Sequence, residues 1–196
     1  MKKIMFNDRY GLTQAVIEGR KTMAMMLINI KSTSDVQVRI FAGYVQIIGR
    51  SGDVCAEKKL SYKVGEVVAV AQRYQDIFDY SNCVNPYAWE DDDKPSGWTN
   101  KMLTKAELMP HQIRITGIKC ERLQDISDAD CLKEGINASN SHEIGYGIPW
   151  VYEFAGSKMV YYTPREAFAA LIDKVLGKGT WECNPWVVAY EFKLVK

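Results

Sequence analysis

Near its N-terminus the chain reads Val16-Ile17-Glu18-Gly19-Arg20-Lys21-Thr22-Met23-Ala24-Met25-Met26. Apolar residues recur at helical spacing over 12–16 and stop before Gly19, a residue type that readily adopts the left-handed conformation at a helix C-terminus. The stretch Met23 to Ile30 is almost wholly apolar, which is typical of a buried strand. The pattern therefore predicts a short helix over 11–18, a turn that presents three polar residues, and then a strand.

The composition indicates one ordinary globular domain. The chain has 196 residues, of which 47% are hydrophobic and 25% are charged, and its formal net charge is +1. This length suits a single core better than two, so we expect one domain over residues 1–196. The near-neutral charge excludes a global basic field, so any nucleic-acid binding has to be local.

The cysteine and histidine content argues against a metal or disulfide framework. The five cysteines are widely spaced and include no C-x-x-C pair, and His111 and His142 are not at ligand spacing. We therefore expect no metal and no cofactor. The N-terminus has no apolar stretch of signal-peptide length and no run approaches the ~20 apolar residues of a membrane span, so the expected location is the cytoplasm.

Periodicity and turn residues predict further elements along the chain. Extended segments are expected at 3–6, 36–48 with a break at Gly43, 67–70 after a turn at Gly65, 112–123 and 186–195. Helices are expected from Ser127 to Glu134 and from Pro164 to Leu176, the latter introduced by the capping box Thr163-Pro164-Arg165-Glu166. The polar and aromatic segment 76–100 is predicted to be a loop insertion or flap.

Several blocks of sequence resemble the ASCH domain family, in its long, phage-associated form. The first is Gly19-Arg20-Lys21-Thr22, and the second is the strand Tyr62 to Val70. Three more blocks match in the same order along the chain: 108–115, 121–127 with 134–136, and 184–192. The resemblance covers roughly the whole chain, and it is weakest at 30–60, 76–100 and 137–162.

This resemblance implies an α+β fold, a PUA-like (ASCH) β-barrel with flanking helices, and a cleft that takes RNA or a modified nucleoside. The resemblance places Arg20, Lys21 and Thr22 at the rim of this cleft as ligand-binding residues. The sequence itself adds Arg114 and Trp98 as candidates, with Arg122 as a further basic residue and Trp150 or Trp186 as alternative aromatic residues. Basic side chains next to aromatic rings suit this role, because they combine phosphate contacts with stacking on bases. Each of these residues also has an ordinary structural explanation, since tryptophans fill cores and arginines surround barrel ends.

The family also includes an amidohydrolase that removes the acetyl group from N4-acetylcytidine with a lysine, a threonine and a glutamate. The resemblance places the lysine at Lys21 and the glutamate at Glu134 as catalytic residues, but it places the threonine at Ala24. Where many family members have an arginine, this chain has Met26. An altered or impaired amidohydrolase is therefore the alternative to a binding protein, with Thr22 or a bound water replacing the missing hydroxyl.

Two further interpretations stay open at the level of sequence. Lys21 and Glu134 can form an ion pair that only ties two segments together, because lysine and carboxylate side chains commonly pair without any catalytic function. The barrel can also serve as a scaffold for a protein partner, in a phage or mobile-element accessory protein.

Overall fold

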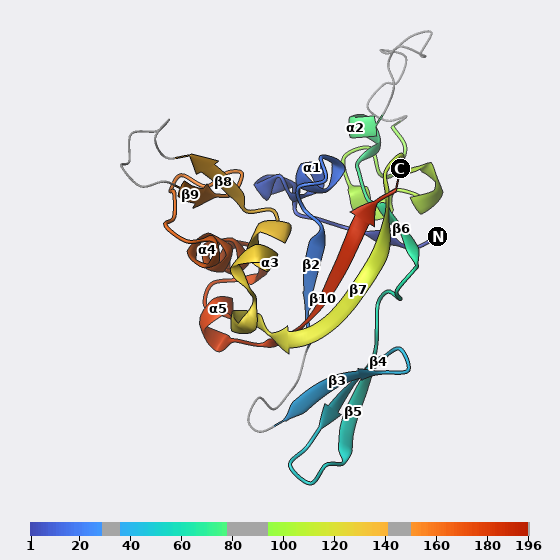
Figure 1. Cartoon of the computed structure of the whole chain (residues 1–196). Coiled ribbons are helices and arrows are strands. Elements are labelled where there is room, and N and C mark those ends of the chain that lie inside the picture. Colours follow the sequence, from blue (N-terminus) through green and yellow to red (C-terminus); the bar gives the residue numbers. More distant parts are fainter. Residues whose placement is uncertain (29–35, 78–93, 141–149, 196) are drawn as a thin grey trace.

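The computed structural model describes residues 1–28, 36–77, 94–140 and 150–195, and the fold is mixed α+β (Figure 1). The strands are β1 (Lys3–Ile4), β2 (Met23–Leu27), β3 (Gln37–Phe41), β4 (Tyr44–Ile48), β5 (Val54–Lys59), β6 (Val67–Val70), β7 (Gln112–Arg122), β8 (Asn137–Asn140), β9 (Trp150–Glu153) and β10 (Trp186–Leu194). The α-helices are α1 (Leu12–Ile17), α2 (Tyr74–Ile77), α3 (Asp128–Lys133), α4 (Pro164–Leu176) and α5 (Thr180–Cys183). Short 3-10 helices are η1 (Asp8–Tyr10), η4 (Lys101–Leu103), η5 (Ala106–Leu108) and η6 (Leu123–Asp125).

A five-stranded sheet with the strand order β1-β6-β7-β10-β2 forms the centre of the molecule. The long strand β10 pairs antiparallel with β7 on one side and with β2 on the other, where Tyr190 lies opposite Ala24. Strand β1 pairs parallel with β6, with Ile4 opposite Val70. Strands β1 and β2 are thus the two edges of this sheet, although they lie close together in the sequence.

The remaining described strands form two smaller sheets. Strands β3, β4 and β5 make an antiparallel sheet that extends below the central one in Figure 1, and β8 pairs with β9. The hairpin between β3 and β4 turns at Ala42 and Gly43, which both have positive φ (49° and 84°), and this confirms the predicted break at Gly43.

The expected closed barrel is not found in the described part of the chain. A barrel needs backbone pairing all round, but β1 has only two residues and no ladder joins it to β2. Residues of both edge strands line one cavity, together with Phe6, Lys21 and Glu134. The coarser prediction of an α+β fold is confirmed, whereas the PUA-like barrel is not.

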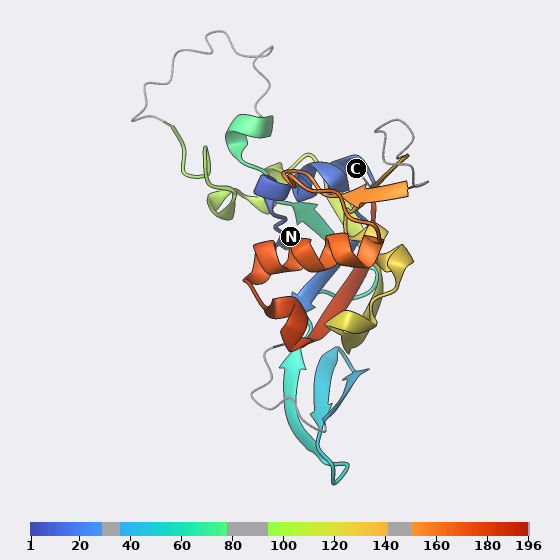
Figure 2. The ribbon, with the colours of Figure 1, turned by 90° about the vertical axis from the view of Figure 1, so that its left-hand side faces the viewer.

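Helices α3, α4 and α5 gather on one side of the central sheet, and α4 runs across its strands (Figure 2). Helix α4 begins and ends where the sequence predicts. The Thr163 side chain accepts a hydrogen bond from the Glu166 backbone N–H, Pro164 occupies the first turn, and Gly177 follows the last residue with φ 114°. Its apolar stripe, including Phe168 and Leu171, is buried.

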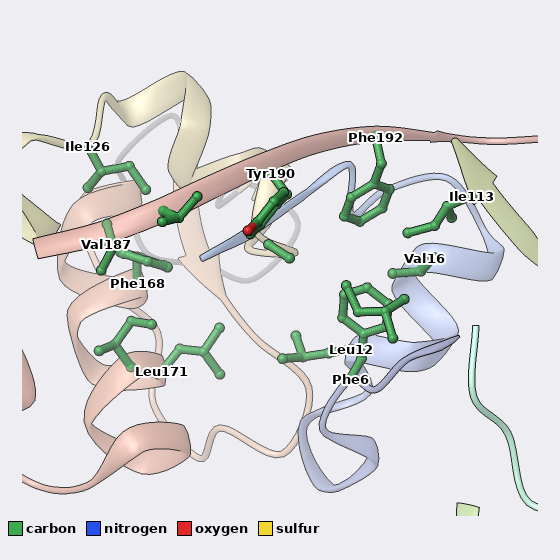
Figure 3. Packing of buried hydrophobic residues seen from close by; sticks show 14 of the residues in the cluster. Phe6, Leu12, Val16, Ile113, Ile126, Phe168, Leu171, Val187, Tyr190 and Phe192 are labelled. Atoms are coloured by element: carbon green, nitrogen blue, oxygen red, sulfur yellow. The ribbon is translucent and has the colours of Figure 1, made fainter. Parts of the chain in front are cut away.

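The core joins the sheet to α4 and to the N-terminal segment (Figure 3). Residues from β10 such as Val187, Tyr190 and Phe192 are almost fully buried, and Phe6 packs against Phe192 with ring centroids 5.8 Å apart. The core therefore brings the segment that precedes α1 next to the strand at the C-terminal end of the chain.

The predicted elements over 11–18, 112–123, 127–134 and 186–195 are all present, with bounds shifted by one or two residues. Gly19 and Gly65 have the predicted positive φ of 73° and 84°. Most of the predicted flap, residues 78–93, lies outside the described residues. Strands β5, β8 and β9 and helices α2 and α5 were not predicted.

Candidate functional site

Lys21 and Glu134 come from two turns that follow short helices. Gly19 ends the turn after α1, and the Lys21 backbone N–H donates to the Ala15 carbonyl oxygen at 2.9 Å. Glu134 follows α3, and its backbone N–H still donates to the Asp130 carbonyl oxygen at 3.1 Å. The chain turns away at Gly135, where φ is 99°. Both side chains are thereby directed inward rather than towards solvent.

The two side chains form a buried ion pair. Lys21 Nζ lies 2.5 Å from Glu134 Oε2, and it also donates to the Glu134 backbone carbonyl oxygen at 2.8 Å. The side chains are only 3% and 6% exposed. Among the described residues, Glu134 Oε1 is buried and has no hydrogen-bond partner. The pair thus keeps one acceptor oxygen unused in a region that water barely reaches.

Burial determines the protonation behaviour of the Glu134 carboxyl. Loss of hydration raises its pKa, although the charge and hydrogen bond of Lys21 and the backbone N–H of Met25 act in the opposite direction. Burial therefore makes the Glu134 carboxyl easier to protonate than an exposed glutamate.

The ion pair lies in the wall of a cavity of about 210 Å³. The cavity lies where the two edges of the central sheet approach α4, and its lining combines four parts of the chain. The described lining residues are Ile4, Met5, Phe6, Asn7, Leu12, Lys21, Ala24, Met25, Met26, Glu134, Phe168, Leu171, Ile172, Val175 and Leu176. Figure 3 shows Phe168 and Leu171 on α4 facing the region of Phe6 and Leu12. Apart from Asn7 and the ion pair, this described lining is apolar.

Ala24 and Met26, the two positions of β2 at which the sequence departs from the motif it resembles, both line this cavity, as does Met25 between them. Ala24 is 7% exposed and places a methyl group where the resemblance expects a hydroxyl. Met25 and Met26 follow Ala24 on the same strand and are both among the lining residues. The two positions that depart from the motif therefore belong to the lining of the candidate site itself.

Arg20 and Thr22, the neighbours of Lys21, are directed elsewhere. The exposed Arg20 guanidinium pairs with the Glu18 carboxylate, and its Nη1 donates to Asn137 Oδ1 at 2.8 Å. The Thr22 backbone N–H donates to the Lys133 carbonyl oxygen at 2.8 Å, and Thr22 is not among the residues that line the cavity. Thr22 is therefore poorly placed to replace the hydroxyl missing at Ala24.

The other predicted ligand residues do not join this site. Arg114 lies on β7 between the buried Ile113 and Ile115, so its side chain is on the opposite face of the sheet from the core. Trp98 belongs to a turn in which its backbone N–H donates to the Pro95 carbonyl oxygen at 3.0 Å. Neither residue lines the cavity.

The sequence did not identify the residues of α4 as part of the candidate site, nor the lining residues at 4–7 and Leu12. The stripe of α4 predicts burial correctly, and Phe168, Leu171, Ile172 and Val175 do face the interior. Periodicity distinguishes buried from exposed positions, but it does not distinguish a filled core from the wall of a cavity. One usable signal is Met25-Met26, because adjacent methionines often line adaptable binding surfaces.

The described residues contain no cluster of three or more metal-ligating side chains, and His142 lies outside them. None of the helices in the described ranges combines the length and the apolar composition needed to span a bilayer. Comparisons with models of protein families, with curated proteins and with solved structures each found no match. The resemblance to the ASCH family therefore remains a prediction from the sequence motifs.

Proposed function

We propose that this chain binds a nucleoside, free or as part of RNA, with the base in the cavity beside Lys21 and Glu134. The ASCH-like motifs are one support for this proposal. The observation that carries it is the ion pair, because two residues that the motifs single out, 113 positions apart, meet in the wall of one cavity.

The dimensions of the cavity support a ring as the bound group. A cavity of about 150 Å³ in another protein holds benzene, and this one has about 210 Å³. A pyrimidine with a small substituent fits such a space, while a sugar and its phosphates would remain outside. Apolar walls with a few polar groups are typical of small-molecule sites.

We further propose that the central sheet is an open relative of a PUA-like barrel. The edges β1 and β2 both contribute to the lining of the cavity, so the site occupies the position where a barrel would close. An opening of this kind supplies an entry path for a ligand.

The test is a titration of nucleosides and short RNAs, including cytidine and N4-acetylcytidine, against the wild-type chain and Lys21→Ala. We expect the variant to lose at least tenfold in affinity. Ala24→Leu is a second variant that fills the cavity without touching the ion pair, and Lys178→Ala on the exposed turn after α4 is the control. Unchanged binding in both cavity variants would remove the basis for the proposal.

Amide hydrolysis is a second candidate function, favoured by the position of the Glu134 carboxylate and the Lys21 ammonium, 2.5 Å apart in the wall of the cavity. In this reaction Glu134 takes a proton from a water molecule, whose oxygen attacks the amide carbonyl carbon. The Lys21 ammonium stabilises the resulting oxyanion, and the proton then passes to the leaving nitrogen as the C–N bond breaks. Products are a carboxylic acid and an amine, so atoms and charges balance.

Ala24→Thr tests this second function, because the substitution restores a hydroxyl in the wall of the cavity with little added volume. Turnover of N4-acetylcytidine would be followed by mass spectrometry in both chains. Turnover by the wild-type chain would support catalysis without the hydroxyl. Turnover only by the variant would mean that the wild-type chain lacks activity because residue 24 is alanine. No turnover by either chain would argue against an enzyme and leave binding as the proposed function.

A further inference from the structure

The small sheet of β3, β4 and β5 turns one face away from the core. Val45 on β4 is buried in the core, and Ile40 opposite it on β3 packs against the same cluster. Because side chains alternate along a strand, the neighbouring positions point to the other side. On that outer face Phe41 lies opposite Tyr44, and Tyr44 lies opposite Lys59. The register therefore places two aromatic residues and a lysine in one row across the three strands.

The two aromatic residues of this row are exposed, although large aromatic side chains usually bury most of their surface. Phe41 is 60% exposed and Tyr44 is 39% exposed. Directly opposite residues of an antiparallel pair have Cβ atoms about 5 Å apart, so the two rings can contact neighbouring groups of one extended ligand. The sheet also projects away from the central sheet (Figure 1). The row is therefore available to a ligand that runs across the strands.

The small sheet is also locally basic. Residues 37–63 contain five lysine and arginine residues and two acidic residues, a net charge of +3, whereas the whole chain has +1. Arg39 lies beside the aromatic row, with its Cζ 5.8 Å from the centre of the Phe41 ring. Its Nε donates to Gln46 Oε1 at 2.8 Å, and Gln46 Nε2 donates to Glu57 Oε1. These hydrogen bonds hold the guanidinium next to the exposed ring.

Exposed rings beside cations match the chemistry of a single-stranded nucleic acid. Unpaired bases stack on aromatic side chains, and basic side chains hold the phosphates. The bases of a duplex are already stacked on one another, so their faces are not free. A protein partner would need about 800 Å² of surface with an apolar centre depleted of charge. This face has only two rings between charged and amide side chains, which favours nucleic acid over protein.

We propose that the outer face of the β3–β4–β5 sheet binds single-stranded nucleic acid, with one base on Phe41, one on Tyr44, and phosphates at Arg39 and Lys59. None of these four residues is among the described residues that line the cavity beside the ion pair. The inference goes beyond the proposed function and does not depend on it. The sheet also lies where the resemblance to the ASCH family is weakest, so its own exposure and charge carry the assignment.

The experiment measures the fluorescence anisotropy of labelled oligo(U) and oligo(dT), each about 12 nucleotides long, with the full chain at a series of salt concentrations. Phe41→Ala and Tyr44→Ala should each lose at least fivefold in affinity, because each removes the ring under one base. Lys59→Ala should reduce the slope of log affinity against log salt by about 0.7, the value for one phosphate of a single strand. Tighter binding of oligo(U) would identify RNA as the ligand, and tighter binding of oligo(dT) would identify DNA.

Three further variants make the assignment specific. Phe41→Leu keeps an apolar side chain without a ring, so it should lose affinity as Phe41→Ala does. If Phe41→Leu bound as tightly as the wild type, the residue would be an apolar contact of the kind found in protein interfaces, and stacking would be wrong. Val64→Ala, at an exposed apolar residue outside this face, and Lys178→Ala, at an exposed lysine, are the controls.

The remaining outcomes separate this inference from the proposed function. Absence of strand binding by the wild type, equal affinities in the wild type and both ring variants, or a duplex that binds as tightly as the single strands would each overturn the inference. The cavity is tested separately with free nucleosides, whose binding Phe41→Ala should leave unchanged. A failure of the nucleoside proposal is therefore distinguishable from a failure of this one.

Discussion

Lys21 donates hydrogen bonds to two different groups of Glu134, the side-chain carboxylate and the backbone carbonyl oxygen. A single lysine thus compensates the charge of the Glu134 carboxylate and holds the backbone of the same residue where α3 ends, 113 positions away in the sequence. The contact links the turn after α1 to the turn after α3, and the cavity lies directly beside it. The stability of the fold and the geometry of the site therefore depend on the same pair.

We predict that removing one member of the pair destabilises the protein more than removing both. Lys21→Met or Glu134→Leu leaves a buried charge without its partner, which costs about 3–5 kcal/mol. The double variant removes both charges and should lie closer to the wild type than either single variant. Urea denaturation measures the free energies of unfolding.

Arg73→Ala is the control for this series. Arg73 pairs with Asp76 at 2.7 Å, but both side chains are about one third exposed, so the loss should stay below about 1 kcal/mol. A Lys21→Met variant that loses no more than Arg73→Ala would mean that the buried pair contributes little to stability.

The sequence predicts elements well where local signals are strong and fails where long-range pairing decides. Helix α4 is predicted to the residue because Thr163, Pro164 and Gly177 mark its ends. Strand β8 reads Asn137-Ala138-Ser139-Asn140, residue types that are poor strand formers, and β5 is exposed along its whole length without alternation. No local signal identifies these strands.

The candidate site shows the same division. Family motifs single out Lys21 and Glu134, and the structure brings them together. Closure of the barrel depends on whether β1 reaches β2, which is a property of the folded sheet that no local pattern encodes. The apolar stripe of α4 likewise predicts burial but does not reveal that Leu171 and Ile172 line a cavity.

At low pH, protonation of the Asp130 carboxylate should lower the free energy of unfolding. Burial alone would raise the pKa of this carboxyl, but hydrogen bonds from Lys119 and Lys133 outweigh it and lower the pKa from 3.8 to about 2. Because the folded-state pKa lies below the unfolded one, the stabilisation is complete above pH 3.8 and is lost as the pH falls towards 2. Its full size is about 2 kcal/mol.

Asp130→Asn should therefore lower the free energy of unfolding at neutral pH and flatten its decline between pH 4 and pH 2. The measurement is urea denaturation at a series of pH values. Asp128→Asn, which removes a 65% exposed carboxylate from the same helix, is the control. If the free energy of unfolding of Asp130→Asn falls as steeply between pH 4 and pH 2 as that of the wild type, other carboxylates cause the loss of stability in acid.

Thr163→Ala should destabilise α4 by about 1 kcal/mol, the usual cost of removing an N-cap side chain. The Thr163 hydroxyl accepts from the Glu166 N–H at 3.1 Å, while the Glu166 carboxylate reaches back to the Tyr162 N–H at 3.1 Å. Thr163→Ser keeps the acceptor and should retain most of the stability. Equal losses in the two variants would attribute the effect to the methyl group instead of the cap.

Gly135→Ala should disturb the ion pair without touching either charge. A Cβ at this position would lie 3.3 Å from Leu12 Cδ2 and 3.6 Å from Lys21 Cβ, and the φ of 99° is itself unfavourable for alanine. We expect a loss of about 1–3 kcal/mol from backbone strain, plus a shift of the Lys21 side chain. Gly65→Ala is the matched control, because its φ is 84° and a Cβ there meets no atom of the described residues within 4 Å.

Two measurements distinguish strain from displacement in these glycine variants. Urea denaturation should show a larger loss for Gly135→Ala than for Gly65→Ala, since only the former adds steric contact to strain. The NMR signal of the Lys21 Nζ should move in Gly135→Ala and stay in place in Gly65→Ala, because only Gly135 lies against the Lys21 side chain. If the signal stayed in place in both variants, Gly135 would matter for the turn alone, and the position of Lys21 would depend on Glu134 and the Phe6 ring.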